Sequence, residues 1–347
     1  MLIAPKFSLR PDRLVLYNEV TPTNKTINGS INNYEIESNN KKENQIVDKK
    51  VKLKKKYHNF RISHNANKTM KEKINWLYYL SKSRYKQTYS GKHIYNYKLS
   101  FITLTLPSKQ VHNTSFITKN IFNQFLTEIR TRSKMNNYVW RLEFQKNKNV
   151  HYHLVTDSYL DYFFIQKIWN RIINKFGYVD NYINKFKDLS LSQYNNLTNK
   201  NNKIDFEIIN RRYLKGKKTN WKEPNTVDVK SVQNRKSIGN YIAKYFSKNS
   251  TDENSCNSLD NEENSFSLRL WFCSRTLSKL KSIKDYFENV NYNIRYVIEN
   301  CSSFKYVHHK YVTVIYYKID NYTNRFGKFL DKLLKSYAKE LGYVSSS

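Results

Sequence analysis

The sequence predicts an α+β fold, an antiparallel sheet with helices on one face, and three observations support this class. Four segments have the alternation and β-rich composition of strands: residues 101–106, 138–145, 150–155 and 226–232. Between them, apolar residues recur at helical spacing. The elements follow one another as β-α-β-β-α-β-α, which fits one sheet covered by helices on a single side.

The boundaries of these elements follow from local chemistry. The first strand, FITLTL, ends at Pro107, and a helix with apolar residues at 117–129 follows. The segment KNKN at 146–149 is a turn, so the two strands that flank it form a hairpin. A helix is predicted over 161–176 with Gly177 as its stop, and the last helix over 237–248.

The charge of the chain indicates a polyanionic partner. Its 347 residues include 61 Lys and Arg but 28 Asp and Glu, a formal net charge of +33. Such a field attracts nucleic acid. The three cysteines have no regular spacing, which is typical of a reducing compartment, and no apolar run is long enough to span a membrane. We therefore expect a cytoplasmic protein that does not bind membranes.

The composition also predicts how the chain is divided. Residues 24–56 are rich in Asn, Lys, Ser and Glu and contain few apolar residues to offset the entropy of ordering. We expect three parts: a largely disordered basic arm over residues 1–75, a catalytic domain over 76–280, and an α/β extension of undefined role over 281–347. The catalytic domain carries polar inserts at about 190–203 and 249–264.

Two histidines in the third strand are candidate metal ligands. His151 and His153 are separated by one residue, so both imidazoles project from the same face of the strand. Glu143 lies in the partner strand, and a three-residue loop with a bulge places it opposite His151. A shifted register makes Gln145 the third ligand instead. Two imidazoles and one oxygen suit Mg²⁺ or Mn²⁺, and we prefer Glu143 because a charged oxygen binds these ions better. The alternative interpretation is a pair of half-exposed strand histidines.

Two tyrosines in the last predicted helix are candidate nucleophiles. Tyr241 and Tyr245 are four residues apart and so share one helix face, with Lys244 and Lys248 beside them. A phenol with a pKa near 10 is a weak nucleophile unless nearby cations lower the cost of the phenolate. The alternative is a basic amphipathic helix whose tyrosines pack against the sheet.

Taken together, these motifs resemble the HUH endonuclease superfamily, in particular the two-tyrosine replication initiators of small circular DNA phages and rolling-circle plasmids. The segments that carry the resemblance are FITLTLP, EFQKNKNVHYH and YIAKYFSK, and it extends over about residues 98–280. It implies a ferredoxin-like or RRM-like palm fold. The metal motif has no glycine at its hairpin turn, which leaves the register and the third ligand open.

The resemblance also implies an activity. Tyr241 would attack the origin strand to give a 5′-phosphotyrosine link and a free 3′-OH, and Tyr245 would act after one round to release a joined circle. We assign DNA binding to Arg235, Lys236 and Lys248. No GxxxxGK[ST] loop is present, so a host helicase and a host DNA polymerase are the expected partners on the single-stranded origin.

Two other functions are compatible with parts of this pattern. A relaxase or transposase of the same superfamily shares the histidine pair, although the close tyrosine pair favours replication. A non-catalytic protein that binds single-stranded nucleic acid would explain the charge and the aromatic content equally well. Cleavage of DNA separates these possibilities.

Overall fold

The structure is a computed structural model of the whole chain. It describes residues 2–21, 62–87, 94–133, 135–199, 203–232, 269–286, 305–310, 312–317 and 325–345. The chain divides into two compact units. The central unit contains residues 59–70 and 82–272, and the terminal unit contains residues 1–58, 71–81 and 273–345.

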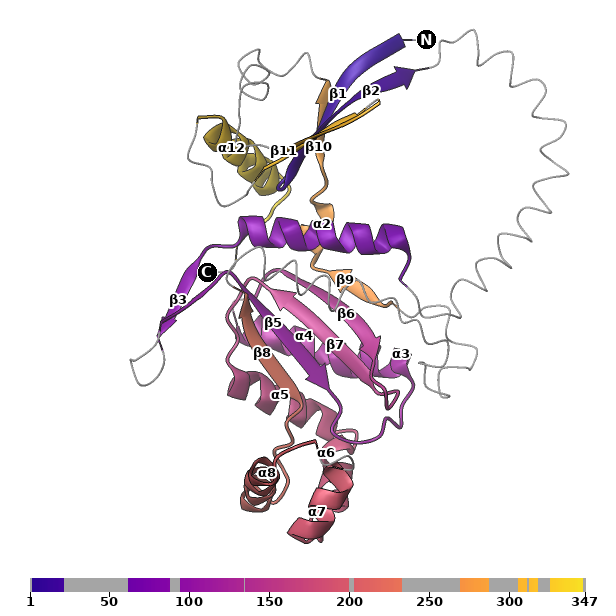
Figure 1. Cartoon of the computed structure of the whole chain (residues 1–347), viewed down its shortest axis with the longest axis vertical. Coiled ribbons are helices and arrows are strands. Elements are labelled where there is room, and N and C mark those ends of the chain that lie inside the picture. The colour runs from indigo at the N-terminus through magenta and orange to yellow at the C-terminus, as the bar shows by residue number, and fades with distance from the viewer. Residues whose placement is uncertain are drawn as a thin grey trace, which may run out of the picture. The chain divides into compact units, whose positions relative to one another are not determined.

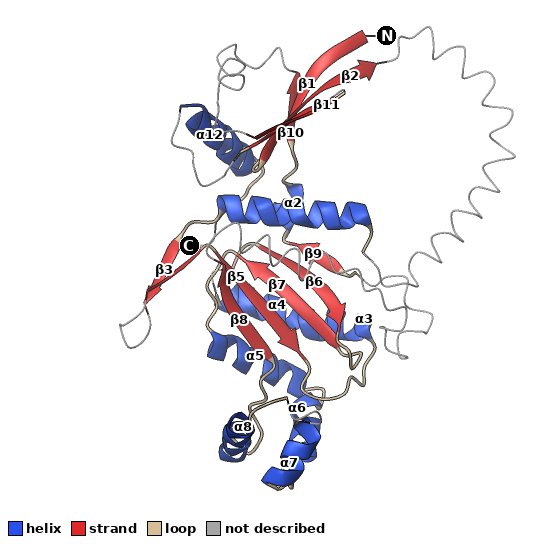
Figure 2. Ribbon diagram, viewed as in Figure 1, coloured by secondary structure: helices blue, strands red, loops and turns tan. Residues whose placement is uncertain are grey.

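The central unit is built on a five-stranded sheet (Figures 1 and 2). Its strands are β5 (Leu99–Thr105), β6 (Tyr138–Phe144), β7 (Val150–Thr156), β8 (Val227–Val232) and β9 (Trp271–Cys273). They lie in the order β8-β5-β7-β6-β9, and the pairs among β5 to β8 are antiparallel. Without β9 this is the strand order of a ferredoxin-like β-α-β-β-α-β unit. The predicted fold class is confirmed.

Two helical segments cover one face of this sheet. The first comprises α3 (Thr114–Phe116), the π-helix η1 (Ile117–Phe122) and α4 (Asn123–Arg132), and the second is α5 (Tyr162–Asn174). Helix α5 begins where the sequence predicts, because the Asp161 side chain accepts hydrogen bonds from the N–H groups of Phe163 and Phe164. Gly177 ends this stretch with a φ of 77°, in the left-handed region that favours glycine.

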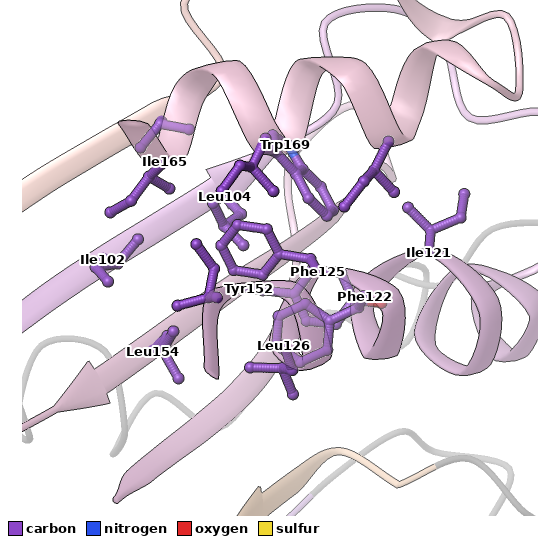
Figure 3. Close-up of a cluster of buried hydrophobic side chains, with 14 of the residues drawn as sticks. Ile102, Leu104, Ile121, Phe122, Phe125, Leu126, Tyr152, Leu154, Ile165 and Trp169 are labelled. Atoms are coloured by element: carbon purple, nitrogen blue, oxygen red, sulfur yellow. The ribbon is translucent and has the colours of Figure 1, made fainter. Parts of the chain in front are cut away.

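The core between sheet and helices is rich in aromatic rings (Figure 3). Its central members are buried apolar side chains from both layers: Ile102, Leu104, Ile121, Phe122, Phe125, Leu126, Tyr152, Leu154, Ile165 and Trp169. The rings of Phe122 and Tyr152 stack with centroids 4.0 Å apart, and the Tyr152 hydroxyl lies 2.7 Å from that of Thr118. Apolar residues of β5 and β7 therefore face the helices at every second position.

A small helical subdomain separates α5 from β8. It consists of α6 (Tyr178–Phe186), α7 (Leu191–Thr198) and α8 (Phe206–Lys218), packed around Phe186, Tyr194, Ile209 and Trp221. The segment predicted as a polar insert, residues 190–203, thus contains a helix. Ser190 and Gln193 form a capping box at its start.

Two further strands of the central unit form a separate ladder. β3 (Arg84–Gln87) and β4 (Ile94–Tyr97) pair antiparallel as a two-stranded sheet. The helix α2 (His64–Leu80) begins in the central unit, and its residues from Lys71 onward belong to the terminal unit.

The terminal unit joins the two ends of the chain in one antiparallel sheet. Its order is β10-β1-β2-β12-β11. The strands are β1 (Leu2–Arg10), β2 (Arg13–Thr21), β10 (Ile283–Tyr286), β11 (Lys305–His309) and β12 (Val312–Tyr316), and α10 (Arg275–Lys279) and α12 (Arg325–Glu340) complete the unit. In α12, Leu330, Leu334 and Ala338 are buried at i, i+4 and i+8.

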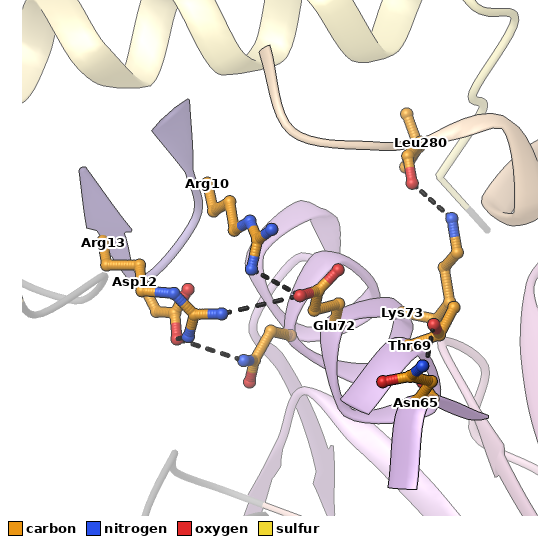
Figure 4. Close-up of polar contacts among 9 residues, drawn as sticks. Arg10, Asp12, Arg13, Asn65, Thr69, Glu72, Lys73 and Leu280 are labelled. Carbon is orange, nitrogen blue, oxygen red and sulfur yellow. Dashed lines mark hydrogen bonds and ion pairs between the residues drawn. The ribbon is translucent and has the colours of Figure 1, made fainter. Parts of the chain in front are cut away.

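Polar contacts in the terminal unit connect its first hairpin to α2 (Figure 4). Arg10 and Arg13 both form ion pairs with Glu72. The ammonium group of Lys73 donates to the carbonyl oxygens of Ser278 and Leu280. Burial lowers the pKa of Lys73, and these carbonyl groups solvate the charge that remains.

The arm predicted over residues 1–75 is therefore too wide. Residues 2–21 form a hairpin within the terminal sheet, and α2 begins at His64. Alternation in β1 and β2 buries Phe7, Leu9 and Leu14, so this part of the chain has enough apolar surface to order itself. Residues 22–61 lie outside the described part of the chain, as do the helix predicted at 237–248 and the insert at 249–264. Among the described helices, none is long and apolar enough to cross a membrane.

The packing of α8 gives a test of the helical subdomain. A Cβ atom at Gly216 would lie 2.2 Å from a ring carbon of Trp221, whose side chain is 3% exposed. Alanine normally stabilises a helix interior relative to glycine by about 1 kcal/mol. We expect Gly216→Ala to destabilise the protein instead, by about 1–3 kcal/mol from overpacking, as measured by urea unfolding. In a Trp221→Ala background the same substitution should become neutral or stabilising. A stabilising effect in the parent protein would contradict this packing.

Candidate active site

The hairpin of β6 and β7 fixes the register of the candidate ligands. Glu143 pairs with His151, and Arg141 pairs with His153. The Gln145 N–H donates to the carbonyl oxygen of Asn149 across the base of the turn, and the Lys148 N–H donates to that of Gln145 at 2.8 Å. The loop is therefore the three-residue type that places Glu143 opposite His151.

The third loop residue explains how the turn forms without glycine. Lys148 has a φ of 66°, in the left-handed region. Three-residue hairpin loops require this conformation at that position, and glycine usually supplies it. Here a lysine adopts it, at a cost of about 1–2 kcal/mol.

Alternation along the strands gathers polar side chains on the sheet face opposite the helices. Tyr152 faces the core, so His151 and His153 on either side of it face away. On β5, Thr105 pairs with His151 and Thr103 pairs with His153. Cross-strand partners share a face, so both threonines lie beside the imidazoles.

His153 is held on three sides. Its Nε2 lies 3.2 Å from Oε2 of Glu143, and its Nδ1 lies 3.3 Å from the hydroxyl of Thr103. The ring stacks on that of Phe101 with centroids 5.5 Å apart, and the side chain is 1% exposed. With the Nε2–H donating to the carboxylate, Nδ1 accepts from the threonine hydroxyl.

His151 lies against the second candidate oxygen ligand. Its Nδ1 is 3.2 Å from the amide group of Gln145, and its ring centroid is 4.4 Å from that of His153. Burial and the neighbouring His153 lower the pKa of His151 to about 3. His151 is therefore neutral at neutral pH, which is the form of imidazole that coordinates metals.

Arg141 belongs to the same cluster, and the sequence analysis did not single it out. It is 5% exposed, and its Nη2 lies 3.4 Å from Oε1 of Glu143. Burial lowers the pKa of Arg141, while the Glu143 carboxylate opposes this shift. Its position two residues before Glu143 on a strand was the available signal, because alternation puts both side chains on one face.

The donor set of this face fits a hard divalent cation. The 3.2 Å between His153 Nε2 and Glu143 Oε2 is close to the roughly 3 Å that separates adjacent ligands of an octahedral ion with bonds near 2.1 Å. Oε1 of Glu143 is buried and accepts no hydrogen bond from the described residues. The donors approach as two pairs, Glu143 with His153 and Gln145 with His151. Among the described residues, no set of three or more His, Cys, Asp or Glu side chains converges on one point.

The structure thus brings Glu143, Gln145, His151 and His153 together. The remaining predicted site residues all follow β8 and lie outside the described part of the chain: Arg235, Lys236, Tyr241, Lys244, Tyr245 and Lys248. Their roles stay predictions from the sequence.

The left-handed residue of the hairpin gives a testable consequence. Lys148→Gly removes the strain at a φ of 66°, and we expect it to stabilise the protein by about 0.5–1 kcal/mol after the entropic cost of glycine. The matched control is Lys146→Gly, which removes the same charge at a loop position without a positive φ and should be neutral or destabilising. Urea unfolding measures both. Equal losses of stability in the two variants would contradict the register described here.

Comparison with known proteins agrees with this geometry. No curated protein and no solved structure matches the chain. Residues 99–250 match the model of a protein family described as replication-associated protein ORF2. The matched span begins at the first residue of β5 and includes the hairpin that carries both histidines. The match supports a replication initiator family for this part of the chain.

Proposed function

We propose that this protein initiates rolling-circle replication by nicking single-stranded origin DNA through tyrosine attack, and that it later rejoins the strand. The observation that carries the proposal is a cluster of two imidazoles, a carboxylate and an arginine on the open face of a ferredoxin-like sheet. This cluster lies within the region that matches a replication-associated family.

In this proposal, His151, His153 and Glu143 hold Mg²⁺ or Mn²⁺, with Gln145 as the alternative third ligand. A bound divalent cation would polarise a phosphate oxygen and offset the charge that develops during cleavage. The chain's own residues prepare the ligands. Thr103 and Phe101 orient the ring of His153, and the buried guanidinium of Arg141 holds the Glu143 carboxylate in place.

The bond changes in the proposed reaction balance without a further reactant. The Tyr241 oxygen forms a bond to phosphorus as the bond from phosphorus to the 3′ oxygen breaks. The phenol loses its proton, and the leaving oxygen gains one to become a 3′-OH. Lys244 stabilises the phenolate, and the product is a 5′-phosphotyrosine that retains the bond energy. Tyr245 then attacks the regenerated origin, and the 3′-OH released by this second cut displaces Tyr241 to close the strand.

The proposal assigns a free 3′-OH to a host DNA polymerase and strand separation to a host helicase. A relaxase or transposase would use the same histidine pair. A protein that only binds single-stranded nucleic acid would have no use for a carboxylate paired with a buried imidazole. Covalent capture of DNA separates the nickases from the binder.

The nicking reaction can be tested without knowledge of the origin. The protein is incubated with Mn²⁺ and a single-stranded oligonucleotide library of randomised sequence, labelled at its 3′ end, because that fragment remains attached through a 5′-phosphotyrosine. We expect an adduct that survives denaturing electrophoresis, and sequencing of the captured strands should give one preferred site. The double variant Tyr241→Phe, Tyr245→Phe should form none.

Single variants define the roles in more detail. Tyr85→Phe is the control, since Tyr85 is an exposed tyrosine of β3 that has no part in the proposed chemistry. It should form the adduct like the parent protein. An adduct in the double variant, or none in the parent, would overturn the tyrosine mechanism. Loss of all adduct in one single variant would leave a nickase that uses one tyrosine.

Metal binding is predicted to separate the two candidates for the third ligand. We expect His153→Ala and Glu143→Ala to weaken Mn²⁺ binding at least 10- to 100-fold, because each removes a donor of the site. Gln145→Ala should change it less. Titration calorimetry measures the affinity, with Glu128→Ala, on the opposite side of the sheet in α4, as the control. Weaker binding in Gln145→Ala than in Glu143→Ala would assign the third ligand to Gln145.

A further inference from the structure

The helical subdomain exposes a strongly basic helix face that the proposed nicking reaction does not use. Helix α8 has five lysines and arginines but one acidic residue among its 13 residues. Figure 2 shows α7 and α8 beyond the ends of the strands of the central sheet. The cations of α8 therefore lie apart from the cluster of histidines.

The packing of α8 determines which face is exposed. Ile209, Tyr213 and Gly216, at i, i+4 and i+7, turn toward the subdomain core, where Gly216 meets Trp221. Residues two positions further along are rotated by about 200° and must face the opposite side. These are Arg211, Lys215 and Lys218, and all three are exposed.

The helix is also fixed in orientation. The Tyr213 hydroxyl donates to the carbonyl oxygen of Leu189 at 2.9 Å, and the ammonium group of Lys217 donates to that of Lys187 at 3.1 Å. These contacts hold α8 against the segment that follows α6. The exposed cations are thus presented by a rigid element.

The exposed cations differ from those on other helices of the protein. Arg132 in α4 pairs with Glu128, and Lys335 in α12 pairs with Asp331, each at i, i+4. Among the described residues, Arg211, Lys215 and Lys218 form no ion pair. Their charge is available to an external anion, and Leu214, 58% exposed, lies between them.

We propose that the Arg211–Lys215–Lys218 face of α8 docks on the phosphate backbone of double-stranded DNA beside the strand that is cut. An α-helix fits the width of the major groove, and three cations along about 10 Å can each meet a phosphate. Sites for single-stranded DNA also need aromatic side chains for stacking, and this face has none. This inference extends the proposed function, but duplex binding is independent of cleavage and is tested separately.

The test compares two triple variants with the same spacing and the same loss of charge. The first replaces Arg211, Lys215 and Lys218 with Gln. The control replaces Lys328, Lys332 and Lys335, which are exposed at i, i+4 and i+7 on α12. Fluorescence anisotropy follows the binding of the full chain to a short mixed-sequence duplex, and to one of its strands, in EDTA over a series of NaCl concentrations.

For the α8 variant we expect the slope of log K against log [NaCl] on duplex DNA to fall by about 2.7, or 0.9 for each lost phosphate contact. The control should keep the parent slope, and binding to the single strand should change less than binding to the duplex. The α8 variant should still form the covalent adduct with the oligonucleotide library, which shows that it is folded and separates this test from that of the nicking reaction.

Three results would overturn the proposal. One is an unchanged slope in the α8 variant. The second is an equal fall in the α12 control, which would mean that total charge and not this face binds DNA. The third is an equal loss of affinity for the single strand, which would assign α8 to polyanions in general.

Discussion

The candidate site depends on the pairing register of β6 and β7. A shift by one residue would turn both histidines into the core and expose Tyr152, because successive side chains of a strand face opposite sides. The register is held from the turn by Lys148 in the left-handed region and from the core by the stacked rings of Phe122 and Tyr152. One backbone constraint thus connects the aromatic core on one face to the histidine cluster on the other.

Burial gives this cluster its chemical character. His151 and Arg141 both have lowered pKa values because they are removed from water, and each is compensated in a different way. The imidazole remains neutral, which suits a ligand, whereas the guanidinium remains beside Glu143 and shares its charge. A buried carboxylate with a histidine on one oxygen and an arginine on the other is costly to maintain in a core. Such an arrangement is more consistent with function than with stability.

The two units solve the problem of ordering a basic, Asn-rich chain in different ways. The central unit orders itself around a single aromatic core, and the helical subdomain adds a small second cluster around Trp221. The terminal unit instead combines segments from both ends of the chain, so that no single stretch has to bury its strands alone. Arg10, Arg13 and Glu72 add ion pairs at the junction of its hairpin with α2.

Local patterns in the sequence determined the central fold and most of its site. Alternation located the strands, Asp161 and Gly177 marked the beginning and end of α5, and one intervening residue put His151 and His153 on one face. Only the tertiary structure decided the contacts between distant segments. The register depended on whether a lysine could adopt a positive φ, Arg141 and Phe101 joined the site through pairing across strands, and β1 and β2 found partners about 300 residues away. Such contacts arise from packing in three dimensions, which no local spacing records.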